Sequence, residues 1–502
     1  MKKYLTEIFY LLGEERKKLW PILVLFFIVS LLDLLGLGLV GPYIAFIVDP
    51  KSMLDGFLGN LITKIGLPED LLLLSIFFGT TLFSIFLIKA IVIIFINFTI
   101  ANFSQNQQIR LRSNLMNAYQ KLPYTDYLQR NSSEYIHSIQ ILVGEYANQV
   151  VLTGLRTVGD TIVAIAIFAL LAWSNGLVLT LLVILLGIII FGYDYFFRNK
   201  LKNYGIQTNL ASRSIVKGVS EGIEGLKEIR ILGKLQFFLN KVRSSAEKFA
   251  YYQTRYIVIT TSPRYLLELL LVGFLVLLVI GAAFSGQSTS ELLPVLGLFG
   301  VAAMRLMPIA NGLSNQLVRL RYGRNAVSIL YKDLSNLEEI KTEPLTLISD
   351  KPEEFETLIL DQIKFTYPST ERLVLNQTSL SIRAGESIGI IGPSGSGKTT
   401  LIDLLLGLLE PEGGSISYNG DPLDKKLTKW RNQVAYLPQQ VFLIDDTVKN
   451  NVALGVEEQK INEKLLLKAL HKSQLTQLVE QLPDGVNTFL GERGVRLSGG
   501  QR

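Results

Sequence analysis

The stretch GPSGSGKTT, from Gly392 to Thr400, follows a short apolar segment that predicts a strand (387–391) and precedes an apolar run that predicts a helix. Glycines at this spacing let successive backbone N–H groups turn toward a phosphate, and the helix N-terminus adds the positive end of its dipole. Lys398 reaches the β- and γ-phosphates, and the Thr399 hydroxyl can ligate Mg²⁺. The stretch therefore predicts a phosphate-binding loop made of Gly392, Ser394, Gly395, Ser396, Gly397, Lys398, Thr399 and Thr400.

The composition of the chain indicates a membrane protein. Of its 502 residues 49% are hydrophobic and only 18% are charged, which is less charge than soluble proteins carry. The net charge of +6 does not indicate a nucleic-acid partner, because the basic residues mostly flank apolar runs. The absence of cysteine excludes disulfides and thiolate metal sites, and with only two histidines no histidine-rich metal site is expected.

Six apolar segments are each long enough to cross the hydrocarbon core of a bilayer. They lie at about 19–47, 71–100, 140–172, 176–197, 257–284 and 291–312. The stretch GEYANQVVLTGLRTVGD is polar for a span, so the third segment is expected to begin as a cytoplasmic helix extension. Ahead of the first segment, Leu5, Ile8, Phe9 and Leu12 share one face of an amphipathic helix that we expect on the inner membrane surface.

The distribution of basic residues orients these crossings. The loops at 101–139 and 198–256 are rich in Lys and Arg, whereas WSNG at 173–176 and SGQSTSE at 285–291 contain none. By the positive-inside rule both termini and the two long loops are cytoplasmic, and the long loops read as helices that extend out of the membrane. Between the first two crossings, Leu54, Phe57, Leu58, Leu61, Ile62 and Ile65 predict a short amphipathic helix on the outer surface.

The sequence predicts two domains: a membrane domain at 1–335 and a nucleotide-binding domain at 356–502. The acidic, proline-containing stretch between them, at 336–355, reads as a linker. Beyond it strand-like and helix-like segments alternate, as in an α/β domain. The expected fold class is therefore a six-helix membrane domain joined to an α/β phosphate-loop domain.

Further motifs specify the phosphate-loop class. No guanine-reading NKxD motif is present, which argues against a GTPase. The stretches FTYP before the loop, YLPQQ after it and GERGVRLSGGQR at the end of the chain resemble the nucleotide-binding domain of ATP-binding cassette (ABC) transporters. The resemblance covers the whole chain and implies a half-transporter of the exporter type, with ATP and Mg²⁺ as cofactors and ATP hydrolysis coupled to transport.

The resemblance also implies roles for individual residues. Tyr367 is similar to the aromatic residue that stacks on adenine. Gln439 is similar to the glutamine that contacts Mg²⁺, and with Lys398 it would serve hydrolysis. The signature residues Ser498, Gly499, Gly500 and Gln501 would cap the γ-phosphate bound by the opposite subunit, which implies a homodimer. The GERG stretch, Glu492 to Gly494, is similar to the loop that meets the inner loops of the membrane domain.

The sequence departs from the family pattern after the signature. It stops at Arg502, so the second acidic strand, the carboxylate that polarises the attacking water and the switch histidine do not appear. We therefore expect the chain as given to bind ATP but to hydrolyse it poorly, and to be part of a longer protein.

Softer motifs concern the cargo. SPRYLLE at 262–268, MRLMPIANGL at 304–313 and the outer amphipathic helix resemble the lipid-linked oligosaccharide flippases of bacterial protein N-glycosylation. This resemblance implies a flippase of the bacterial cytoplasmic membrane with a glycolipid cargo. Lipid A, peptides and drugs remain alternatives, as do an ATP-gated channel and a P-loop regulator that transports nothing.

Three basic residues within or beside the spanning segments, Lys89, Arg264 and Arg305, allow two interpretations. In the structural one they form buried ion pairs with acidic residues such as Asp33, Asp160 and Glu268. In the functional one surplus positive charge lines a wet cavity and attracts the phosphate groups of a lipid-linked sugar.

Overall fold

The computed structural model describes residues 2–48, 71–174, 176–284, 289–339, 353–368, 370–439, 441–491, 494–495 and 497–502. The chain divides into two compact units, Met1–Leu345 and Thr346–Arg502. The predicted outer helix around Leu54 to Ile65, and residues 340–352 of the predicted linker, lie outside the described residues.

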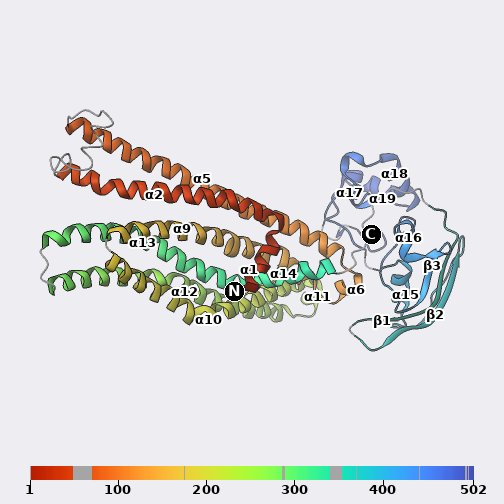
Figure 1. Cartoon of the computed structure of the whole chain (residues 1–502). Helices are drawn as coiled ribbons and strands as arrows, with labels where there is room; N and C mark the ends of the chain where they lie inside the picture. The colour runs from red at the N-terminus through yellow and green to blue at the C-terminus, as the bar shows by residue number, and fades with distance from the viewer. Residues whose placement is uncertain are drawn as a thin grey trace. The chain divides into compact units, whose positions relative to one another are not determined.

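The N-terminal unit is helical (Figure 1), and each of the six predicted crossings lies within a long helical stretch. Four of these stretches, in the part of the chain that the structure describes, are long and apolar enough to cross a membrane: Lys2–Gly36, Leu72–Gln120, Ser132–Ala169 and Leu235–Phe274. The elements are α1 (Lys2–Leu12), η1 (Gly13–Lys18), α2 (Leu19–Val48), α5 (Leu71–Gln120), α6 (Tyr124–Leu128), α7 (Ser132–His137), η2 (Ser138–Leu142), α8 (Val143–Glu145), η3 (Tyr146–Val151), α9 (Leu152–Ser174), α10 (Gly176–Glu224), α11 (Leu226–Ile231), α12 (Leu235–Phe284), α13 (Thr289–Tyr322) and α14 (Arg324–Glu339).

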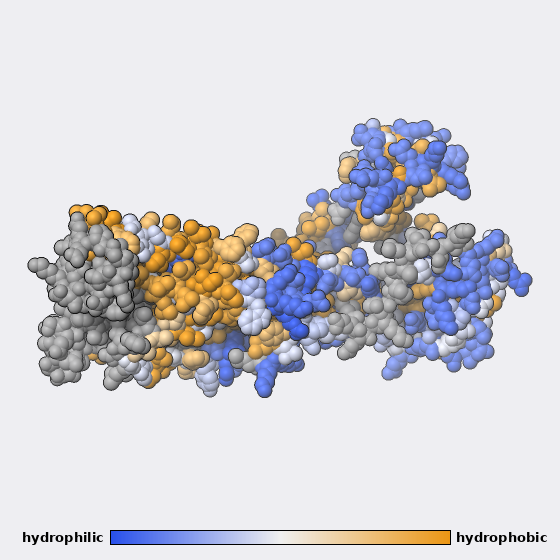
Figure 2. Space-filling view, turned by 45° about the horizontal axis from the view of Figure 1, so that its top comes forward, coloured by the Kyte–Doolittle hydropathy of each residue, from blue (hydrophilic) through white to orange (hydrophobic). Residues whose placement is uncertain are grey.

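The long helices pack in two groups. Helix α2 runs beside α5 and also contacts α9, while α10, α12 and α13 pack against one another and α13 contacts α9. At the end of the bundle far from α14, the α2/α5 pair stands apart from the other four (Figure 1). On the face drawn in Figure 2, hydrophobic residues cover much of this unit. Hydrophilic residues gather toward the end of the unit where α14 lies (Figure 1 and Figure 2). A long apolar band with a polar margin is what a bilayer requires of a spanning bundle.

The third predicted crossing is one helix that contains two π-helical turns, η2 and η3, inside its buried part. The side chain of Tyr146, at the start of η3, is fully buried, and so is Ala147 beside it. A π turn leaves a backbone carbonyl without its usual helical partner. The Ser104 hydroxyl of α5 donates a 2.8 Å hydrogen bond to the Ala147 carbonyl, and so ties α5 to this turn.

The predicted N-terminal amphipathic helix is present as α1. One side of α1 packs into the helical bundle. Leu11 and Leu12 are buried in the main core, whereas Leu5 and Phe9 are half exposed. The carboxylate of Glu7, which is only 3% exposed, pairs with Arg324 of α14 at 3.0 Å. The Tyr4 hydroxyl donates a 2.8 Å hydrogen bond to the carbonyl of Leu320. The predicted position on the membrane surface did not anticipate these contacts.

Replacing Arg324 with alanine is expected to destabilise the bundle, because Glu7 would be left buried without a counter-charge. Removing one partner of a buried ion pair costs about 3–5 kcal/mol. The measurement is thermal unfolding of the purified protein in detergent. Arg243→Ala is the matched control, because the Arg243–Glu247 pair is exposed on both sides and worth at most about 1 kcal/mol. A midpoint for Arg324→Ala equal to that of Arg243→Ala would contradict the role of the pair, and Glu7→Ala in the Arg324→Ala background should recover part of the loss.

The second unit is built on a four-stranded antiparallel sheet with strand order β2-β1-β3-β4. In β1, Leu358, Leu360, Ile363 and Phe365 are buried on alternating positions with one irregularity, as a strand with one covered face requires. The elements are β1 (Thr357–Thr366), β2 (Leu373–Arg383), α15 (Lys398–Leu405), β3 (Gly413–Tyr418), β4 (Asp421–Pro422), α16 (Leu423–Arg431), α17 (Val448–Val452), η4 (Glu458–Lys460), α18 (Glu463–Lys472), α19 (Thr476–Gln481) and η5 (Gly485–Asn487).

One predicted element of this unit is wrong. Residues 387–391, expected as the strand before the phosphate-binding loop, form no strand, and Ile391 is 95% exposed. A strand is stabilised by hydrogen bonds to a neighbouring strand, and none of the described strands lies against this segment. Apolar character alone therefore did not determine its conformation.

Candidate functional site

The phosphate-binding loop has the backbone that its glycines permit. Gly395 and Gly397 adopt φ values of +79° and +91°, in the region that side chains disfavour. A Cβ on Gly397 would also lie 3.2 Å from the carbonyl oxygen of Val374. Gly397 caps α15, which begins at Lys398, so the N–H groups of its first turn open toward the loop. This geometry suits an anion at the helix N-terminus.

The loop lines a cavity of about 650 Å³. Every predicted loop residue from Ser394 to Thr400 contributes to its wall, and so do Tyr367 and Gln439. Sequence reasoning missed four further lining residues. They lie within six residues after FTYP, so a turn that follows the FTYP strand could have indicated that the chain returns to the cavity there. They are Thr370, Arg372, Leu373 and Val374.

Three contacts of Tyr367 fix the aromatic side of this cavity. The Tyr367 ring packs edge-on against Phe365 at 5.0 Å between centroids. Its hydroxyl lies 3.2 Å from the hydroxyl of Thr400, which is itself buried at the base of the loop. The backbone N–H of Thr370 donates to the Tyr367 carbonyl at 2.9 Å and closes a turn around the tyrosine. Tyr367 is thereby held beside the phosphate-binding loop.

Lys398 is folded back onto its own loop. Its ammonium donates hydrogen bonds to the carbonyls of Gly392 at 2.9 Å and Pro393 at 2.8 Å. Because an ammonium group has three donors, Lys398 can keep part of this contact while it turns toward a phosphate. The loop is therefore pre-shaped around its lysine.

Helix α16 positions the far end of α15. The Trp430 indole N–H donates to the carbonyl of Leu405 at 2.7 Å, and the Arg431 guanidinium donates to Gly407 at 2.6 Å. Donors at a helix C-terminus satisfy carbonyls that lack helical partners, and a cation there also opposes the helix dipole. These contacts fix the axis of α15 and, with it, the direction in which its N-terminus points.

The residues predicted for Mg²⁺ share the cavity. The Thr399 hydroxyl and the Gln439 amide both line it, and uncharged oxygen donors of this kind suit a hard cation that also binds substrate phosphates. Among the described residues no group of three or more His, Cys, Asp or Glu could hold a metal by itself. Thr399 and Gln439 thus fit a cation brought with the nucleotide.

The signature residues do not join this cavity. Ser498, Gly499, Gly500 and Gln501 form an exposed turn in which the N–H of Gln501 donates to the Ser498 carbonyl at 3.1 Å. None of them is among the residues that line the loop's cavity. Glu492 and Arg493 of the GERG stretch lie outside the described residues.

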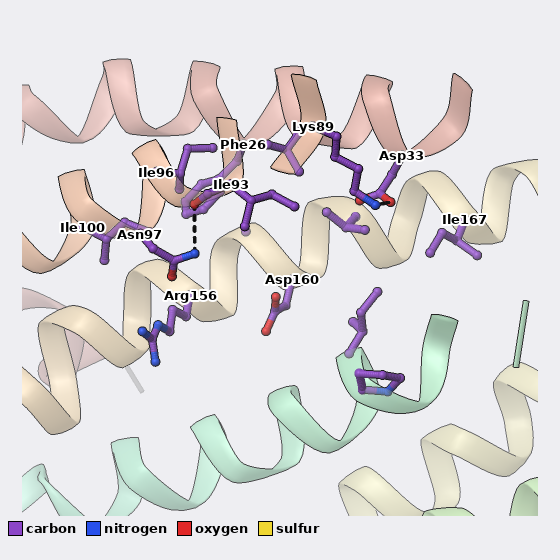
Figure 3. A pocket seen from close by; sticks show the side chains of 15 residues that line it. Phe26, Asp33, Lys89, Ile93, Ile96, Asn97, Ile100, Arg156, Asp160 and Ile167 are labelled. Carbon is purple, nitrogen blue, oxygen red and sulfur yellow. Dashed lines mark hydrogen bonds and ion pairs between the residues drawn. The ribbon is translucent and has the colours of Figure 1, made fainter. Parts of the chain in front are cut away.

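A second cavity, of about 710 Å³, lies in the helical unit between α2, α5, α9 and α13. Its wall is mostly aliphatic, with five polar side chains that Figure 3 shows: Asp33, Lys89, Asn97, Arg156 and Asp160. Arg156 and Asp160 stand one helical turn apart on α9 and project from the same face (Figure 3). The amide of Gln316 donates to Asp160 at 2.6 Å.

The three predicted substrate residues fall in different surroundings. The buried Lys89 pairs with the buried Asp33, as the structural interpretation requires, and both line the cavity. Arg264 is exposed on α12, outside the cavity lining, and makes no ion pair with Glu268. The side chain of Arg305 lies outside the described residues. Sequence reasoning missed Arg156, an exposed cavity residue that has no hydrogen bond or ion pair with any residue that the structure describes.

Comparisons with known proteins indicate which protein family the chain resembles. Residues 375–502 match the family model described as ABC transporter. The ATP-dependent lipid A-core flippase of Cupriavidus pinatubonensis is 26% identical over 397 residues, which are 78% of this chain and 66% of that protein. The flippase of the same name from Dechloromonas aromatica is 27% identical over 462 residues, 90% of this chain and 75% of the relative. The chain thus spans about two thirds to three quarters of the length of these relatives.

A solved structure described as a bacterial Atm1-family ABC exporter with ATP bound matches with a TM-score of 0.74. It is 19% identical, and the match covers 97% of this chain and 82% of that one. This likeness shows the fold. The expected resemblance to ABC exporters is thereby confirmed for the nucleotide-binding domain and for the architecture of the whole chain.

Proposed function

We propose that this chain, which carries an ABC transporter domain and has the fold of an ABC exporter, is half of an ATP-driven flippase for a glycolipid with a phosphate-bearing head group. The observation that carries the proposal is the cavity between α2, α5, α9 and α13. It combines aliphatic walls with the exposed cation of Arg156, which makes no hydrogen bond or ion pair with a described residue but interacts electrostatically with Asp160. A site with both properties matches a molecule that has lipid chains at one end and anionic groups at the other.

ATP and Mg²⁺ are the proposed cofactors. Lys398 would contact the β- and γ-phosphates, Tyr367 would stack on the base, and Thr399 and Gln439 would hold the cation, which neutralises phosphate charge when bound. The rest of the site is supplied by a second copy in the proposed homodimer. Each phosphate-binding loop would face the Ser498–Gln501 turn of the opposite chain, because a turn outside its own cavity can serve a symmetric partner. Closure of two such domains would change access to the membrane cavity.

The proposed cargo is a glycolipid of one of two kinds. The resemblance noted in the sequence favours a lipid-linked oligosaccharide, whereas the relatives bear the name lipid A-core flippase. Both kinds join phosphorylated sugars to long hydrocarbon chains. The proposed location is the bacterial cytoplasmic membrane, with the nucleotide-binding domain and both ends of the chain on the cytoplasmic side.

The test is transport by the full-length protein in proteoliposomes. ATP is added to the side of the nucleotide-binding domain, and the leaflet position of a fluorescent glycolipid is followed by quenching from outside. We expect net, ATP-dependent transfer of a lipid-linked oligosaccharide or of lipid A-core, and the preferred one identifies the cargo. A neutral glycolipid of equal chain length, without phosphate, is the control and should move much more slowly.

Two outcomes would overturn the proposal. An ATP-gated channel would let solutes equilibrate in both directions without net accumulation of the glycolipid. A regulator without transport activity would bind ATP and leave every lipid in its original leaflet.

A further inference from the structure

We propose that Arg372 is an electrostatic capture residue, which draws the incoming nucleotide into the cavity before Lys398 engages its phosphates. The inference rests on the proposed function in so far as the ligand is ATP. It goes beyond that function by assigning a role in the rate of binding to a residue outside the motifs recognised in the sequence.

The first argument is the balance of charge at the cavity. Its lining contains two cationic side chains, Arg372 and Lys398, and no Asp or Glu. A cavity with one sign of charge on its wall raises the local concentration of a ligand of the opposite sign. Arg372 directly precedes β2, in the segment that follows the turn around Tyr367, and it lines the same cavity as the loop.

The second argument is that the two cations differ in availability. The ammonium of Lys398 is bound to the carbonyls of Gly392 and Pro393. Arg372 is exposed and has no hydrogen bond or ion pair with any residue that the structure describes. An approaching triphosphate therefore meets one cation that is free and one whose hydrogen bonds must first rearrange. The free charge of Arg372 therefore controls the rate of association, and Lys398 controls the affinity of the bound complex.

The size of the effect follows from Coulomb's law. For MgATP with a net charge of about −2 at about 6 Å, one positive charge in water changes the local ligand concentration roughly ten-fold in the absence of salt. Screening at about 0.15 M ionic strength reduces this factor to roughly three-fold. Charges at the rim of a site act mainly on the association rate and on its salt dependence, whereas buried partners act on the dissociation rate.

The experiment is stopped-flow binding of the Mg²⁺ complex of a fluorescent ATP analogue to the protein, at ionic strengths from about 0.02 to 0.3 M. Arg372→Gln should lower the association rate constant about six-fold at the lowest salt and about three-fold at about 0.15 M, with a dissociation rate constant within about two-fold of wild type. Arg372→Lys keeps the charge and should keep the wild-type rate. Arg372→Glu should bind more slowly than Arg372→Gln.

Arg383→Gln is the matched control. Arg383 is an exposed arginine at the far end of β2, about 36 Å from Arg372 at the usual rise per residue. At that distance its charge is screened at all but the lowest salt, so Arg383→Gln should bind at the wild-type rate. Both variants are at exposed positions, and unchanged circular dichroism would confirm that they fold.

The proposal is overturned if Arg372→Gln associates at the wild-type rate, or if its defect lies only in faster dissociation, which would make Arg372 a contact of the bound state. It is also overturned if Arg372→Lys is as slow as Arg372→Gln, because then the guanidinium shape matters and not the charge. Absence of saturable binding to the wild-type protein is a different result. It would refute the nucleotide site of the proposed function itself.

Discussion

Substitution of Lys398 by alanine is expected to weaken ATP binding by about 10- to 100-fold and to stop transport by the full-length protein. The ammonium supplies charge-assisted hydrogen bonds to phosphate oxygens, and one such bond contributes about 1.5–3 kcal/mol. Every 1.4 kcal/mol corresponds to a factor of ten in affinity. Equilibrium titration with a fluorescent ATP analogue in the presence of Mg²⁺ measures the effect directly, without requiring hydrolysis.

Lys468→Ala is the control for this experiment. Lys468 is exposed on α18 and does not line the cavity, so its removal subtracts the same charge from the same domain. Its affinity for ATP should remain within a factor of two of wild type, because the charge lies outside the site and is screened. Equal affinities for Lys398→Ala and Lys468→Ala would refute the assignment of GPSGSGKTT as the phosphate-binding loop.

The candidate phosphate-binding loop could be located from the sequence because its residues are consecutive. The conformation of the loop from Gly392 to Thr400 depends on local backbone geometry, and its glycines mark the positions where positive φ values are expected. The residues that complete the cavity from other segments were harder to find. Tyr367 and Gln439 came from the family resemblance, whereas Arg372 belongs to no motif and is placed there by the turn that precedes β2.

The strand predicted at 387–391 was wrong for a related reason. A helix satisfies its backbone within one segment, so α15 could be predicted from its own residues. A strand is satisfied only by a neighbour, and the sequence of 387–391 does not state which strand lies beside it. The described sheet instead pairs β1 with β2 and β3, three segments whose register depends on one another.

In the helical unit each of the six apolar runs lies within a long helical stretch, but α5, α10, α12 and α13 extend beyond their runs. The contacts between helices did not follow from the runs either. Asp33 and Lys89 are 56 residues apart, and only the packing of α2 against α5 brings them together. By contrast Arg264 and Glu268 are one turn apart and remain exposed without pairing. Asp160, a candidate ion-pair partner, accepts a hydrogen bond from the amide of Gln316 and interacts electrostatically with Arg156, one turn away on α9.

Arg156 was overlooked although its neighbour Asp160 was not. Both belong to the polar stretch GEYANQVVLTGLRTVGD, whose start was expected to be a cytoplasmic extension of the third crossing, and only Asp160 was considered among the charges of the membrane domain. In the structure the same stretch contains the π turn η3 and the start of α9, and Arg156 reaches the cavity from α9. The polar residues of this stretch thus include Arg156, whose charge lies in the cavity wall.

Arg156→Gln is expected to reduce glycolipid transport at least ten-fold while basal ATP hydrolysis by the full-length protein stays near wild type. A guanidinium binds two phosphate oxygens at once, and loss of one such charged contact corresponds to about 1.5–3 kcal/mol. Glutamine retains polarity and most of the length of the side chain but no charge. Arg156 makes no hydrogen bond or ion pair with any described residue, and Asp160, with which it interacts electrostatically, keeps the hydrogen bond from Gln316, so the substitution should spare folding.

Four variants serve as comparisons in the same transport assay. Arg264→Gln removes an exposed arginine outside the cavity lining and should transport normally. Lys89→Met leaves Asp33 buried without its partner and should fail by misfolding, and exchanging the two charges as Asp33→Lys with Lys89→Asp should partly restore expression. Arg305→Ala, predicted from the sequence to abolish transport, extends the test to a residue whose side chain lies outside the described part of α13.

Arg156→Lys sharpens the test further. Lysine keeps the positive charge but cannot form the planar two-point contact with a phosphate, so it should restore only part of the transport lost in Arg156→Gln. Full restoration would indicate that the cavity attracts its cargo by charge alone. Normal transport by Arg156→Gln, with Arg264→Gln also normal, would show that the cavity between α2, α5, α9 and α13 does not bind the anionic group of the cargo through Arg156.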